Sequence, residues 1–268
     1  MQHAAAVANY LRPFIHDADA HYQWTFDEAL ATEIVGIEFD PTESWLEKTV
    51  RLKGFLGKQL MTTSDRNEHL RLAHYFISHW GGVRTNRKLD DLIDNTRRLA
   101  SLGRAAFEDV PIEGVSSWSK YLTLLCDWAP IYDSRVAYSI NAINFMAGQT
   151  QCFFAMPDGR SPRLSLIDLE TLFVLSLAGD GLIADADLGH KHFASRTRGR
   201  YHTPARQTYG LYVRFLEEVA QQLNLAPGGS HTIEMLLFSL APGKVLSDLI
   251  KRLSAQSPFG VSNWSIRG

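Results

Sequence analysis

Lys120 and Asp133, in the middle of the chain, carry side chains that could react with a substrate. A neutral lysine amine is a nucleophile, and a carboxylate stabilises a neighbouring cation. Apolar residues recur at steps of three and four in 117–128, which predicts a helix with Lys120 on its other face, toward solvent or a cleft. Asp133 starts the next predicted helix, on the inward side that Val136 continues. The ordinary alternatives are a solvated lysine and a helix-capping aspartate.

The segment that contains both residues has a recognisable order of turns and helices. A glycine turn leads to a short helix, a proline break and a second helix, and the segment reads PIEGVSSWSKYLTLLCDWAPIYDSRVAYSINAI over 111–143. In chain order, the landmarks are Gly114-Val115, Ser119-Lys120, Pro130 and Ile131-Tyr132-Asp133. This order resembles the helix-hairpin-helix superfamily of DNA glycosylases, especially its 8-oxoguanine glycosylase-like branch. The tyrosine-rich helix expected at 204–223 and the EMLLF run at 234–238 are also similar to that branch.

The resemblance implies a fold and a reaction. It implies a mostly α-helical, two-lobed domain over 1–268, with a helix-hairpin-helix element, a cleft between the lobes and a catalytic segment at about 111–147. Lys120 would be the amine nucleophile and Asp133 the assisting carboxylate of an enzyme that excises a damaged or modified base from DNA. Partial burial would lower the pKa of Lys120 and supply its neutral form, and the helix N-terminus would keep Asp133 ionised. A Schiff base on Lys120 would add strand cleavage to base removal.

Further site residues follow from the need to hold a base that has been flipped out of the duplex. Aromatic and glycine residues near the pair could form a base pocket, although core packing is their ordinary role. Arg135 could contact a phosphate or the flipped base, the alternative being a solvated arginine. The candidates for base or DNA contact beside the pair are Trp80, Gly81, Gly82, Ser119, Tyr132 and Arg135.

The overall charge of −2 argues against binding nucleic acid through bulk electrostatics. Cations are nevertheless concentrated in 190–206, which has no acidic residue and could meet DNA phosphates; they are Lys191, Arg196, Arg198, Arg200 and Arg206. Neither a phosphate-binding glycine motif nor a cluster of metal ligands is visible in the sequence, so we expect no cofactor and no metal. The expected partner is duplex DNA with a modified base, without an obligatory protein partner.

Helical periodicity dominates the rest of the chain. Thr25 and Glu28 have the spacing of a capping box and predict a helix start near 25. Further helices are expected at 41–61, 65–80, 88–102, 165–178, 230–240 and 242–255, with one extended stretch at 151–156 and an irregular connection at 179–204.

Two cysteines do not form a disulfide framework, and no long apolar run or basic leader is present. We therefore expect a cytoplasmic protein without a membrane span.

Two questions stay open at this point. The substrate base could be an oxidised purine or a larger, hypermodified base of phage DNA, the latter implying antiviral defence. The alternative of another class is a catalytically inactive DNA-binding protein with the same fold.

Overall fold

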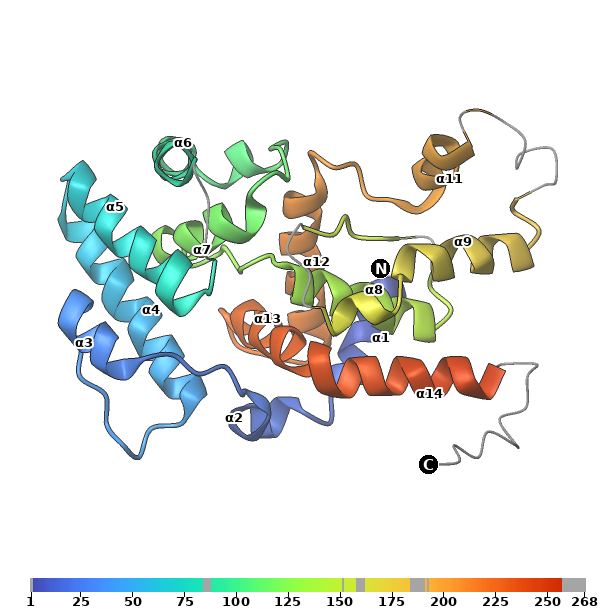
Figure 1. The fold of residues 1–268 in the computed structure, drawn as a ribbon, viewed down its shortest axis with the longest axis horizontal. Helices are drawn as coiled ribbons and strands as arrows, with labels where there is room; N and C mark the ends of the chain where they lie inside the picture. Colours follow the sequence, from blue (N-terminus) through green and yellow to red (C-terminus); the bar gives the residue numbers. More distant parts are fainter. Residues whose placement is uncertain are drawn as a thin grey trace, which may run out of the picture.

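The computed structural model describes residues 2–83, 88–150, 152–157, 162–183, 191 and 193–256, and within these ranges the protein is all-α (Figure 1). The helices are α1 (Gln2–Leu11), α2 (Ala18–His21), α3 (Glu28–Val35), α4 (Trp45–Thr62), α5 (Arg66–His74), α6 (Leu89–Ser101), α7 (Val115–Leu125), α8 (Ser134–Met146), α9 (Leu169–Gly179), α11 (Phe193–Tyr201), α12 (Thr208–Gln222), α13 (Gly229–Leu240) and α14 (Leu246–Gln256). Short π-helical turns continue α5 at Tyr75–Trp80 and precede α14 at Ala241–Val245. The helices expected from periodicity are therefore confirmed, with shifts of a few residues at their ends.

Three expectations about local structure were wrong. The helix expected near Thr25 begins at Glu28 and is capped by Asp27, whose side chain accepts a hydrogen bond from the Leu30 N–H. The stretch 151–156 forms no strand among its described residues and contributes only an isolated bridge between Phe153 and His202. The connection at 179–204 contains a helix, α11, whereas residues 184–190 and 192 lie outside the described part of the structure.

Two hydrophobic clusters organise the described residues. The larger cluster draws on α1, α8, α9, α12, α13 and α14, and the smaller one on α3 to α6. These two sets of helices lie on different sides of the molecule in Figure 1, with α7 between them. α7 contributes Trp118 and Leu122 to the larger cluster and Tyr121 and Leu124 to the smaller one. Because apolar side chains cover α7 from both sides, even its polar face has little access to water.

Within the described residues, no helix is both long enough and apolar enough to cross a lipid bilayer.

Candidate functional site

Lys120 lies in the interior of the protein. Only 5% of the residue is exposed, and its Nζ donates a hydrogen bond to the Ser116 carbonyl oxygen at 2.7 Å. Burial lowers the pKa of Lys120, an effect that the nearby carboxylates of Asp133 and Glu234 partly oppose. The lysine therefore faces neither solvent nor an open cleft, and its buried surroundings favour the neutral amine.

Asp133 caps α8, which is the role described above as the ordinary alternative for this aspartate. Its Oδ1 accepts hydrogen bonds from the backbone N–H groups of Arg135 and Val136, at 2.9 and 3.0 Å. The preceding residue is tied to α7, because the backbone N–H of Tyr132 donates to Ser119 Oγ at 3.0 Å. Ser119 thus connects the helix that carries Lys120 to the loop that ends in Asp133, and fixes the two residues relative to each other.

Lys120 and Asp133 line the same small cavity. The cavity has a volume of about 10 Å3, room for about one water molecule, and its other walls come from four separate segments of the chain: Tyr22, Trp24, Trp80, Gly81, Ile131, Glu234 and Phe238. The aromatic rings form a connected wall, since Trp24 packs edge-on against Trp80 and against Phe238, with ring centroids 6.3 and 5.1 Å apart. Trp24 Nε1 also donates to the Trp80 carbonyl oxygen at 3.0 Å. We call this space the lysine cavity.

Gly81 is in direct contact with the lysine. A Cβ at this position would lie 2.6 Å from Lys120 Cε and 2.7 Å from the Ile77 carbonyl oxygen. Of the two glycines after Trp80, only Gly82 has a positive φ, of 67°. Gly81 is thus required for close packing against Lys120, while Gly82 supplies the turn.

Glu234 is a site residue that the sequence analysis did not single out. It is 3% exposed, lines the lysine cavity, and its Oε2 lies 3.4 Å from Lys53 Nζ. Burial raises the pKa of Glu234, Asp133 raises it further, and Lys53 and Lys120 oppose the change. The sequence does mark this residue, because Glu234 is the one acidic residue in the apolar run 233–237. A helical segment that is apolar on all sides is expected to be buried, and a carboxylate inside it needs a partner.

Arg135 lies beside the cavity. Its guanidinium lies over the rings of Phe238 and Trp24, at 4.6 and 5.3 Å from their centroids. Tyr132, in contrast, is fully buried, and its hydroxyl donates to the Ala155 carbonyl oxygen, so it does not line the cavity. Of the predicted contacts, Trp80 and Gly81 line the lysine cavity with the pair, whereas Ser119 acts through the backbone of Tyr132.

The predicted basic segment is largely engaged with the protein itself. Arg198 pairs with Glu170, Arg206 with Asp109, and Arg200 donates to the Leu182 carbonyl oxygen. Lys191 is exposed, and the Arg196 side chain lies outside the described part of the structure. α11 and the lysine-bearing α7 lie on opposite sides of α12 in Figure 1. The structure therefore does not bring Arg198 and Arg200 to the lysine cavity.

In the described ranges, no group of three or more His, Cys, Asp or Glu side chains is placed to hold a metal ion. The chain has no match among protein-family models, curated proteins or solved structures. Its site is therefore interpreted from its own residues.

Proposed function

We propose that the protein is a DNA glycosylase that flips a modified base out of duplex DNA and excises it at the lysine cavity. The observation that carries this proposal is the convergence of Lys120 and Asp133, from different helices, in one buried space with an aromatic wall. A buried amine with a lowered pKa, an adjacent carboxylate and a wall of aromatic rings are the groups that base excision requires. The proposed fold is correspondingly two-lobed, with the DNA cleft between the two hydrophobic clusters.

The reaction uses the three ionisable residues in different roles. The neutral Lys120 amine attacks C1′ of the sugar while the bond from C1′ to the base nitrogen breaks, and the electron pair of that bond leaves with the base. The carboxylate of Asp133 stabilises the positive charge that develops on the sugar. Glu234, whose pKa is raised, is the acid in this cavity that can give a proton to the departing base. The attached nitrogen then loses a proton and the sugar ring opens, which gives a Schiff base on Lys120. Elimination of the 3′ phosphate from this Schiff base would cleave the strand, and hydrolysis by water releases the sugar from Lys120.

The site must open before it can act. A volume of about 10 Å3 does not admit a base, and the wall that closes it includes Trp24 and Phe238 under the Arg135 guanidinium. A DNA phosphate would compete with these rings for Arg135, because an ionic hydrogen bond to phosphate is stronger than a cation–π contact. We infer that DNA binding draws Arg135 away and lets Trp24 and Phe238 move apart to receive the base.

The proposed substrate is duplex DNA with either an oxidised purine or a hypermodified base of phage DNA. The proposal needs no cofactor, metal or second protein, because the amine and the carboxylates supply the chemistry. It places the protein in the cytoplasm, where it would serve DNA repair or antiviral defence.

The deciding experiment measures base release by mass spectrometry from a panel of duplexes with oxidised or phage-type modified bases. We expect release by the parent, and a loss of more than about 100-fold in Lys120→Gln and in Asp133→Asn. Lys48→Gln and Asp168→Asn are matched controls, since Lys48 is also buried and Asp168 also caps a helix, both away from the cavity. Their activity should equal that of the parent.

Two outcomes would contradict the proposal. If no duplex releases a base but the protein and its double variant Lys120→Gln/Asp133→Asn bind DNA equally, the chain is a DNA-binding protein without this activity. If the double variant releases the base as fast as the parent, the lysine cavity is not the active site. Borohydride trapping tests the mechanism separately, because an active enzyme that forms no covalent complex does not use Lys120 as its nucleophile.

A further inference from the structure

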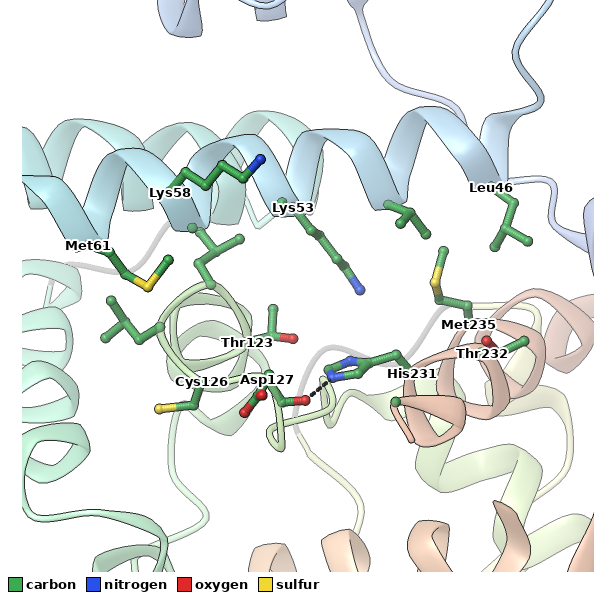
Figure 2. A pocket seen from close by; sticks show the side chains of 16 residues that line it. Leu46, Lys53, Lys58, Met61, Thr123, Cys126, Asp127, His231, Thr232 and Met235 are labelled. Carbon is green, nitrogen blue, oxygen red and sulfur yellow. Dashed lines mark hydrogen bonds between the residues drawn. The ribbon is translucent and has the colours of Figure 1, made fainter. Parts of the chain in front are cut away.

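A second and much larger opening lies beside the lysine cavity. It has a volume of about 740 Å3 and runs between one face of α4, the end of α7 and the start of α13 (Figure 2). We call it the α4 groove. Its apolar lining includes side chains that are strongly exposed to water, 56% at Val50 and 72% at Met61. The other apolar walls are Leu46, Leu125 and Met235. Organic ligands of moderate size occupy pockets of this volume.

A glycine keeps the centre of the groove open. α4 has two glycines on its groove face, and they have different surroundings. A Cβ on Gly57 would lie 2.8 Å from the Leu124 carbonyl oxygen, so this glycine allows α4 to pack against α7. A Cβ on Gly54 would have no atom within 4 Å. A glycine inside an α-helix lowers its stability, and packing offers no reason for one at position 54. The missing side chain leaves space for a ligand.

Polar groups converge on the middle of the groove. Figure 2 shows Lys53 reaching down from α4 toward Thr123 and His231. The Lys53 side chain is only 12% exposed. Thr123 Oγ1 is buried and has no hydrogen-bond partner in the described part of the chain. His231 Nε2 lies 2.6 Å from the Asp127 carbonyl oxygen, which can only accept, so Nε2 carries the hydrogen and Nδ1 is an acceptor.

We propose that the α4 groove binds an apolar organic anion, with its acidic group at Lys53 and Thr123 and its apolar body against Met61 and Leu125 or against Leu46 and Met235. The ammonium and the unpartnered hydroxyl are donors, which a carboxylate or sulfonate accepts. Lys58 also lines the groove. The carboxylates that oppose an anion are the exposed Asp127 in the groove and Glu234, whose Oε2 lies 3.4 Å from Lys53 Nζ. The flexible methionines at both ends accommodate bodies of different shape.

The test uses 1-anilinonaphthalene-8-sulfonate, a fluorescent apolar anion, in a titration of the folded protein. We expect saturable binding to one site. Gly54→Leu should weaken it at least about tenfold by filling the groove, whereas Gly54→Ala, the matched control, should stay within about twofold of the parent. Both substitutions should raise the melting temperature, because neither side chain meets a neighbour at its Cβ. Equal affinity in the leucine and alanine variants would overturn the proposal.

The charge of the ligand and the position of its site are tested independently of the two Gly54 variants. Octanoate should displace the probe, while octylamine, with the same chain and the opposite charge, should not; displacement by both equally would contradict an anion site. Lys53→Met should weaken binding about tenfold. The bound probe should slow alkylation of Cys126, which lines the groove, and leave Cys152 unchanged. Equal protection of both cysteines, or of neither, would place the probe elsewhere.

Lys53 also connects the groove to the lysine cavity, because the same ammonium lies 3.4 Å from Glu234. An anion that draws Lys53 toward the groove removes the cation nearest to Glu234. The groove ligand is therefore expected to change the rate of base release, and this consequence rests on the proposed function. Direct binding of the probe does not depend on it. A protein that binds the probe but releases no base would refute the proposed function and leave the groove ligand in place.

Discussion

Gly81 gives the sharpest test of the packing around Lys120. In Gly81→Ala the new Cβ would lie 2.6 Å from Lys120 Cε and 2.7 Å from the Ile77 carbonyl oxygen, whereas an ordinary contact begins at 3.4 Å. Both contacts must therefore lengthen, by roughly 0.8 and 0.7 Å, and the Ile77 oxygen belongs to the backbone of the same turn. The Lys120 side chain can shift more easily than the backbone oxygen of Ile77. We expect a loss of about 1–3 kcal/mol in the free energy of unfolding, the usual cost of overpacking a core.

Gly82→Ala is the matched control. Its Cβ would meet only the edge of Trp24 at 3.9 Å, but its φ of 67° is unfavourable for alanine. A residue forced into this conformation costs about 1–2 kcal/mol, so the two variants should be similar in stability. They should differ in chemistry, because only Gly81→Ala displaces the amine.

The assays are urea unfolding and the initial rate of borohydride trapping on the best substrate duplex. A displacement of about 1 Å from a reactive geometry costs on the order of 100-fold in rate, so Gly81→Ala should lose trapping to that degree while Gly82→Ala keeps it. If the two variants trap equally fast, the contact between Gly81 and Lys120 has no part in the reaction. If Gly81→Ala is as stable as the parent, the packing argument itself fails.

Three further predictions concern stability. Burial lowers the pKa of Lys120, so the folded protein binds fewer protons there than the unfolded chain. The parent should therefore gain stability relative to Lys120→Met as pH rises toward 10.5, and parallel pH curves would refute this. The raised pKa of Glu234 has the opposite sign, so in thermal melts the parent should lose stability relative to Glu234→Gln as pH rises above 4.5, and a constant difference would contradict it. Ser44→Ala should cost about 1 kcal/mol through the lost cap of α4, whereas Thr25→Ala should cost little; an equal loss in both would show that the capping box is misassigned.

The two capping patterns show what a local sequence signal leaves undecided. Thr25 with Glu28 and Ser44 with Glu47 have the same spacing, yet only the second pair forms a capping box. Glu28 instead accepts a hydrogen bond from Lys48 Nζ at 2.7 Å, and Asp27 takes over as the cap of α3. The competing partner comes from another helix. Such a contact depends on the tertiary fold and is not visible in a window of four residues.

α1 was missed although its pattern is clear. Ala4, Val7, Ala8 and Leu11 recur at steps of three and four, and all four are fully buried in the larger cluster. The first helix predicted from the sequence starts near residue 25, so no helix was expected here. Periodicity alone would have identified this helix.

Lys120 shows how far the sequence can predict the surroundings of a site residue. The helical wheel placed it opposite Trp118 and Leu122, which is correct, but a wheel gives the direction of a side chain and not what covers it. Tyr121 and Leu124 bring the smaller cluster against that side of α7 and close it from water. The approach of Glu234 from a distant part of the chain was likewise beyond reach, because it depends on how α13 packs.

The charges around the lysine cavity do little for the fold. Lys120 and Glu234 are both more than nine-tenths buried, and burial disfavours the charged form of each. Apolar residues of similar size would fill the same positions at no such cost. The opposite charges of Lys53 and Asp133 offset part of this cost. Replacing any one of these four charged residues would leave a neighbouring opposite charge without its partner. An arrangement that is unfavourable for stability and held together by mutual compensation is expected where ionisable groups are kept ready to react.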